Sequence, residues 1–149
     1  MWLLVRADSL DDYWGANAPA RTLAACPDTD ERGDPWRWTA TLAEHEHGAE
    51  VLIDADPDYI GVQTTVYSDG HSGIIRRAAG QQLVLTSLRG QVLVAAVDGP
   101  WERWLNPGDV FIVEGEEDEE LRISLDAAES KASATLLAPR RAAALRWVP

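Results

Sequence analysis

Apolar and polar residues alternate in short runs along most of the chain. The stretch "WRWTATLA" at 36–43 places aromatic or aliphatic residues at every second position, and "LRISLDA" at 121–127 repeats this with Leu121, Ile123 and Leu125. A period of two is typical of a β-strand with one buried face. We therefore predict strands in both stretches, with the three residues of the second pointing inward.

Further short apolar runs end at turn residues and are also predicted to be strands. The runs 82–88 and 91–97 flank Arg89-Gly90, which predicts a tight hairpin because Gly90 can take a positive φ. Both faces of these runs are largely apolar, so we expect this pair to lie between other layers. Other predicted strands lie within 2–7, 49–57, 59–70, 73–80, 101–105 and 110–114, the fifth ending at Asn106-Pro107-Gly108.

The resulting pattern predicts an all-β protein with few short helices. About ten short strands with frequent turns favour an antiparallel sandwich or barrel. One helical turn is expected near 9–15, where Ser9 can cap it, and the alanine-rich stretches 126–134 and 140–147 fit either strand or helix. Nothing divides the chain, so we expect one domain over 1–149.

The charge balance excludes some partner classes. The chain has 13 basic and 25 acidic residues and a net charge of −12, which disfavours binding to nucleic acid or to an anionic membrane. No apolar run is long enough to cross a membrane, and the first residues do not resemble a signal peptide. A single cysteine, Cys26, suits a reducing compartment, so the expected location is the cytoplasm.

The segment 90–116, "GQVLVAAVDGPWERWLNPGDVFIVEGE", resembles the second half of a cupin, a small double-sheet jelly roll. Gly90 follows a strand, a variable stretch comes next, and Pro107, Gly108 and Asp109 stand before another strand, as in the cupin pattern. The resemblance implies a double-stranded β-helix.

The first part of the chain resembles the HutD/Ves family of cupin-like proteins. The family's glycine triplet is replaced by Ala18-Pro19-Ala20, and its strand arginine is Thr39 here. The matching positions are Leu4, Arg6, Ala7, Trp14, Asn17, Arg21, Thr22, Leu23, Ala24, Trp36, Trp38, Thr41 and Ala43.

This resemblance implies a bicupin-like fold without metal, cofactor or established catalytic activity, and a regulatory link to histidine utilisation. The leading hypothesis is a non-catalytic protein that binds a small metabolite, expected to be a carboxylate. Arg21 would pair with the anion, Asn17 would orient it and Trp38 would form an apolar wall. Arg77 is a further candidate if it faces the cavity, whereas Arg76-Arg77 facing outward would only balance acidic neighbours. A homodimer through edge strands is compatible with this architecture.

A metal-dependent cupin enzyme, such as a dioxygenase or isomerase, is the second hypothesis. His45 and His47 lie two apart, so on a strand they share a side, and Glu50 follows. However, the cupin position for another histidine falls within Glu116–Glu120, and the histidine pair lies too far from 88–91. A polar strand end is the simpler interpretation.

A purely structural or protein-interaction module is the third hypothesis, in which an exposed edge or an aromatic patch would pair with a partner.

The acidic run "EGEEDEE" at 114–120 lacks the ligand spacing of a calcium loop and is expected to be a solvated hairpin tip. Most of the seven tryptophans are expected in the core, because each buries a large apolar area.

Overall fold

The computed structural model describes residues 2–5, 20–25, 38–45, 48–68, 70–125 and 129–140. These residues form twelve β-strands and contain no helix. The strands are β1 (Trp2–Val5), β2 (Ala20–Ala25), β3 (Trp38–His45), β4 (Gly48–Ala55), β5 (Ile60–Ser68), β6 (Ser72–Arg77), β7 (Gln82–Arg89), β8 (Val92–Ala96), β9 (Glu102–Leu105), β10 (Val110–Val113), β11 (Glu119–Leu125) and β12 (Lys131–Pro139). The prediction of an all-β fold is confirmed, although the described residues contain none of the few short helices that were expected.

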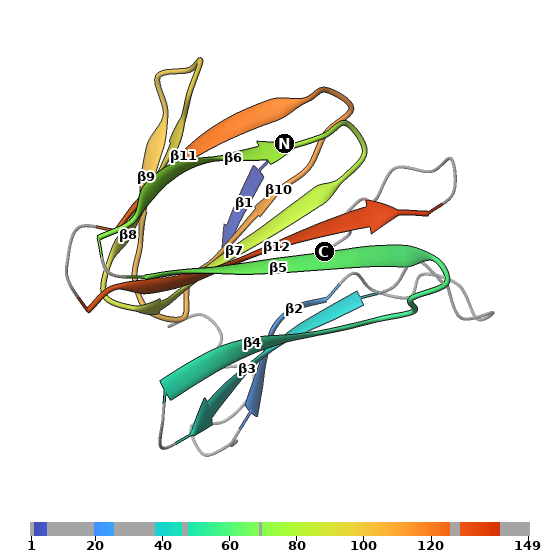
Figure 1. Cartoon of the computed structure of the whole chain (residues 1–149), viewed down its shortest axis with the longest axis horizontal. Coiled ribbons are helices and arrows are strands. Elements are labelled where there is room, and N and C mark those ends of the chain that lie inside the picture. The colour runs from blue at the N-terminus through green and yellow to red at the C-terminus, as the bar shows by residue number, and fades with distance from the viewer. Residues whose placement is uncertain are drawn as a thin grey trace.

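The strands form three antiparallel sheets. A five-stranded sheet has the order β1-β10-β7-β12-β5, a four-stranded sheet the order β6-β11-β8-β9, and a three-stranded sheet the order β2-β3-β4. The five-stranded sheet lies between the other two, as Figure 1 shows for β5 and β12. No helix of the described residues is long and apolar enough to span a membrane.

Each face of the five-stranded sheet packs against a different core. Leu85 of β7 and Phe111 of β10 face the four-stranded sheet and pack with Leu121 and Ile123 of β11. The alternate residues of β7 and β10 face the three-stranded sheet, where Val84 belongs to the same buried cluster as Trp38 of β3. The alternation of a strand explains this division, because successive side chains point to opposite faces. The apolar run of β7 is therefore buried on both faces, as predicted, whereas β8, the other member of the predicted pair, lies in the four-stranded sheet and alternates between buried and half-buried residues.

The predicted hairpin between β7 and β8 is wrong. β7 bonds to β10 and β12, whereas β8 bonds to β9 and β11 of the other sheet. Gly90 takes the expected positive φ of 69°, but the turn carries the chain from one layer to the next. The Ser87 hydroxyl holds this turn by donating to the Gly90 carbonyl at 2.6 Å. A tight turn does not specify pairing, and here Leu83 and Leu85 of β7 pack in one buried cluster with Val92 and Val94 of β8 across the two facing sheets.

The other local predictions fare better where the structure describes them. Leu121, Ile123 and Leu125 are buried as expected, and the turn at 106–108 is closed by the Asp109 amide, which donates to the Asn106 carbonyl at 2.9 Å. The helical alternative for 126–134 is wrong over 131–134, which belongs to β12. The stretches 9–15 and 141–147 lie outside the described residues, so their predictions stay open.

The core predicts a strong response to truncation of Phe111. Its side chain has no solvent exposure, so Phe111→Ala should lower the free energy of unfolding by about 3–5 kcal/mol, through lost burial and the cavity left behind. The free energy is measured by urea denaturation. Ile74→Ala is the control, because Ile74 is 51% exposed and should change stability by less than about 0.5 kcal/mol. Equal losses for the two variants would contradict this account of the core.

Candidate functional site

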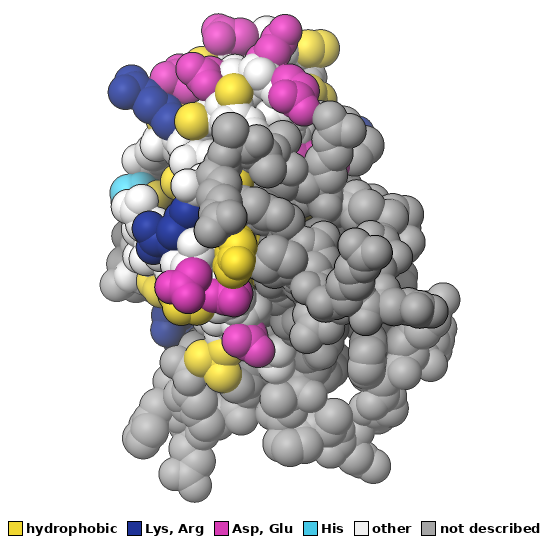
Figure 2. Space-filling model, turned by 90° about the vertical axis from the view of Figure 1, so that its right-hand side faces the viewer, with side chains coloured by type: hydrophobic (Ala, Val, Ile, Leu, Met, Phe, Trp, Pro, Cys, Tyr) yellow, Lys and Arg dark blue, Asp and Glu magenta, His cyan; other side chains and the backbone are white. Residues whose placement is uncertain are grey.

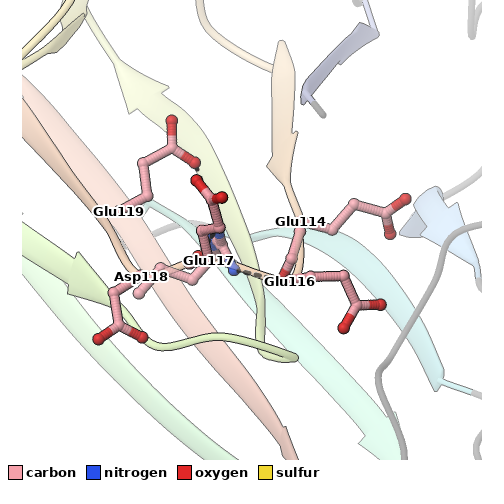
Figure 3. A pocket seen from close by; sticks show the side chains of 7 residues that line it. Glu114, Glu116, Glu117, Asp118 and Glu119 are labelled. Carbon is pink, nitrogen blue, oxygen red and sulfur yellow. Dashed lines mark hydrogen bonds and ion pairs between the residues drawn. The ribbon is translucent and has the colours of Figure 1, made fainter.

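A cavity of about 500 Å³ lies beside the segment that joins β10 to β11. We call this segment, Glu114–Glu119, the acidic segment. It lines the cavity together with Arg77, the last residue of β6. Figure 3 shows the side chains of Glu114 and Glu116 on one side of the segment, while Glu117 and Glu119 extend toward each other on another. Residues 116–118 are exposed, whereas Glu114 is buried, so the segment is not wholly a solvated tip as expected.

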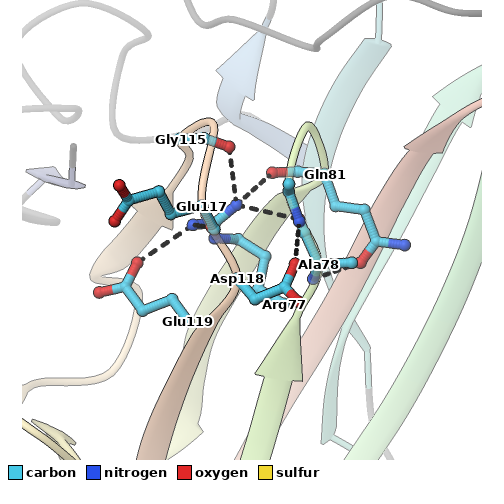
Figure 4. Close-up of polar contacts among 8 residues, drawn as sticks. Arg77, Ala78, Gln81, Gly115, Glu117, Asp118 and Glu119 are labelled. Carbon is cyan, nitrogen blue, oxygen red and sulfur yellow. Dashed lines mark hydrogen bonds and ion pairs between the residues drawn. The ribbon is translucent and has the colours of Figure 1, made fainter.

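Arg77 is buried and fastens the acidic segment to the turn between β6 and β7 (Figure 4). Its Nη1 and Nη2 atoms donate mainly to backbone carbonyls, and its Nε is buried without a hydrogen-bond partner. The acceptors are Ala78 O at 3.1 Å, Gln81 O at 3.2 Å and Gly115 O at 3.1 Å for Nη1, and Glu117 O at 2.9 Å and Glu119 Oε2 at 3.2 Å for Nη2. Both terminal nitrogens therefore already bind protein acceptors, and Arg77 lines the cavity as the sequence allowed. Its role toward a ligand stays a prediction.

The neighbouring arginine behaves differently. Arg76 points to the other face of β6, where its side chain is 82% exposed and its Nε donates to Glu120 Oε1 at 2.7 Å. It balances an acidic neighbour on the surface, which was one of the two expectations for this pair. The alternation of β6 thus gives two adjacent arginines unlike environments.

Trp38 is completely buried and belongs to a polar chain that reaches the acidic segment. Its Nε1 donates to Gln82 Oε1 at 2.6 Å, and Gln82 Nε2 donates to Glu114 Oε2 at 2.7 Å. Gln82 itself has no solvent exposure. This chain joins β3, β7 and the acidic segment through the core, so Trp38 acts here as a buried donor with no surface open to solvent.

Two of the four predicted ligand-binding residues thus lead to one place. Trp38 reaches Glu114 through Gln82, and Arg77 bonds to the carbonyl of the next residue, Gly115. Arg21 lies in β2, where it pairs in register with Leu42 of β3, the strand that also carries Trp38. Asn17 lies outside the described residues. The roles of Arg21 and Asn17 stay predictions.

The residues of the metal hypothesis lie at the turn between β3 and β4. His45 pairs in register with Gly48 and Glu50 pairs with Ala43, while His47 lies outside the described residues. Among the residues described, no three His, Cys, Asp or Glu side chains are arranged to hold a metal ion. A metal site at His45, His47 and Glu50 stays a prediction.

Sequence reasoning missed Gln82 and Glu114. Gln82 opens the apolar strand β7, and a polar residue that enters a buried strand needs a partner. The tryptophan of β3 carries the same requirement, because a buried indole N–H must find an acceptor. The need of each side chain for a hydrogen-bond partner is visible in the sequence. Only the packing of the three-stranded sheet on β7 shows that Trp38 and Gln82 are partners.

A second, smaller hollow of about 220 Å³ adjoins the first. It shares Asp118 and Glu119 with the larger cavity, and Trp101 and Asp98 contribute to its other side. Figure 2 shows Asp and Glu side chains in groups on one face of the described surface, with Lys and Arg beside some of them. The surroundings of the acidic segment are rich in carboxylates, because Asp98 and Glu120 line the smaller hollow beside Asp118 and Glu119.

Comparison with known proteins identifies the fold and leaves the activity open. No family model and no curated protein matches the sequence. A solved structure of PA5104, a conserved protein of unknown function from Pseudomonas aeruginosa PAO1, is similar in fold. The TM-score is 0.69 at 12% identity, over 93% of this chain and 99% of that one. A de novo designed double-stranded β-helix matches with a TM-score of 0.42 at 13% identity, over 52% of this chain and 97% of the design. The chain has a cupin-like jelly-roll fold.

The two adjacent arginines provide a matched test of the site's construction. Arg77→Met should lower the free energy of unfolding by about 3 kcal/mol, because a buried guanidinium is lost and the backbone carbonyls and the Glu119 carboxylate that it binds lose a charged donor. Arg76→Met should cost less than about 1 kcal/mol, as is usual for an exposed ion pair. Urea denaturation of both variants gives the comparison. Similar small losses would show that Arg77 does not hold the acidic segment.

Proposed function

We propose that this protein is a non-catalytic, cupin-like binding protein for a small metabolite, and that the ligand docks in the cavity beside the acidic segment. The cavity of about 500 Å³ is the observation that carries this proposal. Its volume falls within the range of small-molecule sites, and cupin-like barrels are suited to enclosing such a site.

The lining of the cavity indicates the charge of the ligand. Five carboxylates line it, from Glu114, Glu116, Glu117, Asp118 and Glu119, against one guanidinium. That guanidinium is already bound to protein acceptors, so it compensates only part of the negative charge. The field of the cavity therefore favours a ligand with a positively charged group, such as a primary ammonium. The carboxylates at 116–118 are exposed beside the cavity and are the ones placed to meet such a group, with Asp118 also accepting a hydrogen bond from the Ala79 amide at 2.8 Å.

A second candidate is the carboxylate ligand expected from the resemblance to the HutD/Ves family, with a regulatory role in histidine utilisation. Arg21 and Asn17 would hold the anion. The pairing of β2 with β3 favours this candidate, because it brings the Arg21 backbone next to the strand of Trp38. The two candidates differ in the sign of the ligand's charge, which makes them separable.

Two four-carbon probes of opposite charge test the choice. Putrescine should raise the melting temperature, whereas succinate should not, because the cavity repels anions. A probe at tenfold its dissociation constant adds about 1.4 kcal/mol, which corresponds to roughly 3–6 °C for a chain of this size. The melting temperature is measured by differential scanning fluorimetry, with potassium chloride at equal ionic strength as the salt control.

Substitutions locate the binding. The double variant Glu117→Gln/Asp118→Asn should lose the putrescine response, and the control Glu102→Gln/Glu129→Gln, which also removes two exposed carboxylates, should keep it. A succinate response that Arg21→Ala abolishes would replace the first candidate by the second. No response to either probe, or a putrescine response that survives in the acidic-segment variant, would overturn the proposed site.

A further inference from the structure

The strand β5 differs from the other strands that end the three described sheets. The edge strands β2, β4, β6 and β9 each contain charged residues, and β1 has four residues. β5 has nine residues, "IGVQTTVYS", without charge or proline. Its pairing with β12 runs from Ile60 to Ser68 with no register shift. Proteins usually protect a long edge strand with lysine, proline or a bulge, and β5 has none of these.

The middle of β5 is exposed on both faces. The five residues from Val62 to Val66 are all exposed, with Val62 at 45% and Val66 at 53%. Val62 and Val66 lie on the face that also carries Thr64, opposite Leu137, Thr135 and Ser133 of β12. Because β5 ends the order of its sheet, alternate backbone N–H and C=O groups of this stretch point away from β12.

The sequence of this stretch is complementary to itself. In an antiparallel pair of two β5 strands centred on Thr64, Val62 of each copy faces Val66 of the other, Gln63 faces Thr65, and Thr64 faces Thr64. Valine pairs and threonine pairs are favourable neighbours across antiparallel strands. The Thr64 hydroxyl already bonds to that of Thr135 at 2.9 Å, so the central threonines extend an existing row of hydroxyls.

The distribution of charge also favours a second copy of the chain as the partner of β5. A chain with a net charge of −12 repels a second copy over most of its surface. β5 is uncharged along its whole length, so a second copy can approach there without placing like charges opposite each other. From these observations we infer that the protein forms a twofold homodimer by antiparallel pairing of β5 with β5, which joins two five-stranded sheets into one.

The association of the full chain in solution tests this inference. Sedimentation over a range of protein concentrations should show a dimer of the native chain. Val66→Lys should weaken dimerisation by ~10-fold or more, because each dimer loses two valine pairs and must accommodate two ammonium groups at the seam. Ile74→Lys is the matched control, since Ile74 is 51% exposed on β6 and adds the same charge. It should dimerise like the native chain.

Cross-linking tests the register and does not depend on the stability of the lysine variant. In a Cys26→Ser background, Thr64→Cys should be joined to a second copy by a short bismaleimide, whereas Ile74→Cys should not. A native chain that is monomeric at all concentrations would overturn the inference. So would a Val66→Lys variant that dimerises as tightly as the native chain, or cross-linking that is equal at positions 64 and 74.

Discussion

Burial of both faces of the five-stranded sheet is the constraint on which the rest of the structure depends. β7 and β10 carry apolar side chains on both sides, and each side needs its own covering layer. The four-stranded sheet covers one face and the three-stranded sheet covers the other. The hairpin-like sequence around Gly90 therefore connects two sheets. The acidic segment also connects these two sheets, because it joins β10 to β11.

The buried guanidinium of Arg77 fixes the acidic segment against the turn between β6 and β7. The guanidinium donates to the carbonyls of Gly115 and Glu117, and the Gly80 amide donates to the Gly115 carbonyl as well. The arginine satisfies them and fixes the segment on which several carboxylates are displayed. Its positive charge also moderates their mutual repulsion, so one side chain serves both the folding of the acidic segment and its electrostatics.

The sequence predicts the strands well, because alternation is a local property. The inward positions of β11 and the turn at 106–108 follow directly from residue order and turn chemistry. Pairing between sheets is not local, which is why the turn at Gly90 was assigned to a hairpin. The site is harder to predict than the strands. A run such as Glu114–Glu120 looks uniformly solvated, although Glu114 is buried and accepts a hydrogen bond from a glutamine 32 positions earlier in the chain. Which arginine of the pair at 76–77 is buried depends on the register of β6 against β11, and composition does not carry that information.

The chain of hydrogen bonds from Trp38 through Gln82 to Glu114 has a consequence for what the cavity can distinguish. The Glu114 carboxylate accepts from the core, and drawing it away would leave the buried Gln82 amide nitrogen without this acceptor. Glu114 is thus held by the core, whereas the side chains at 116–118 are exposed to solvent, with the segment fastened by Arg77 at the Glu117 carbonyl and by the Ala79 amide at Asp118. In the proposed binding function, Glu114 would therefore limit the size of the ligand and the outer carboxylates would attract it, so substitutions at 116–118 should alter affinity more than the range of ligand sizes.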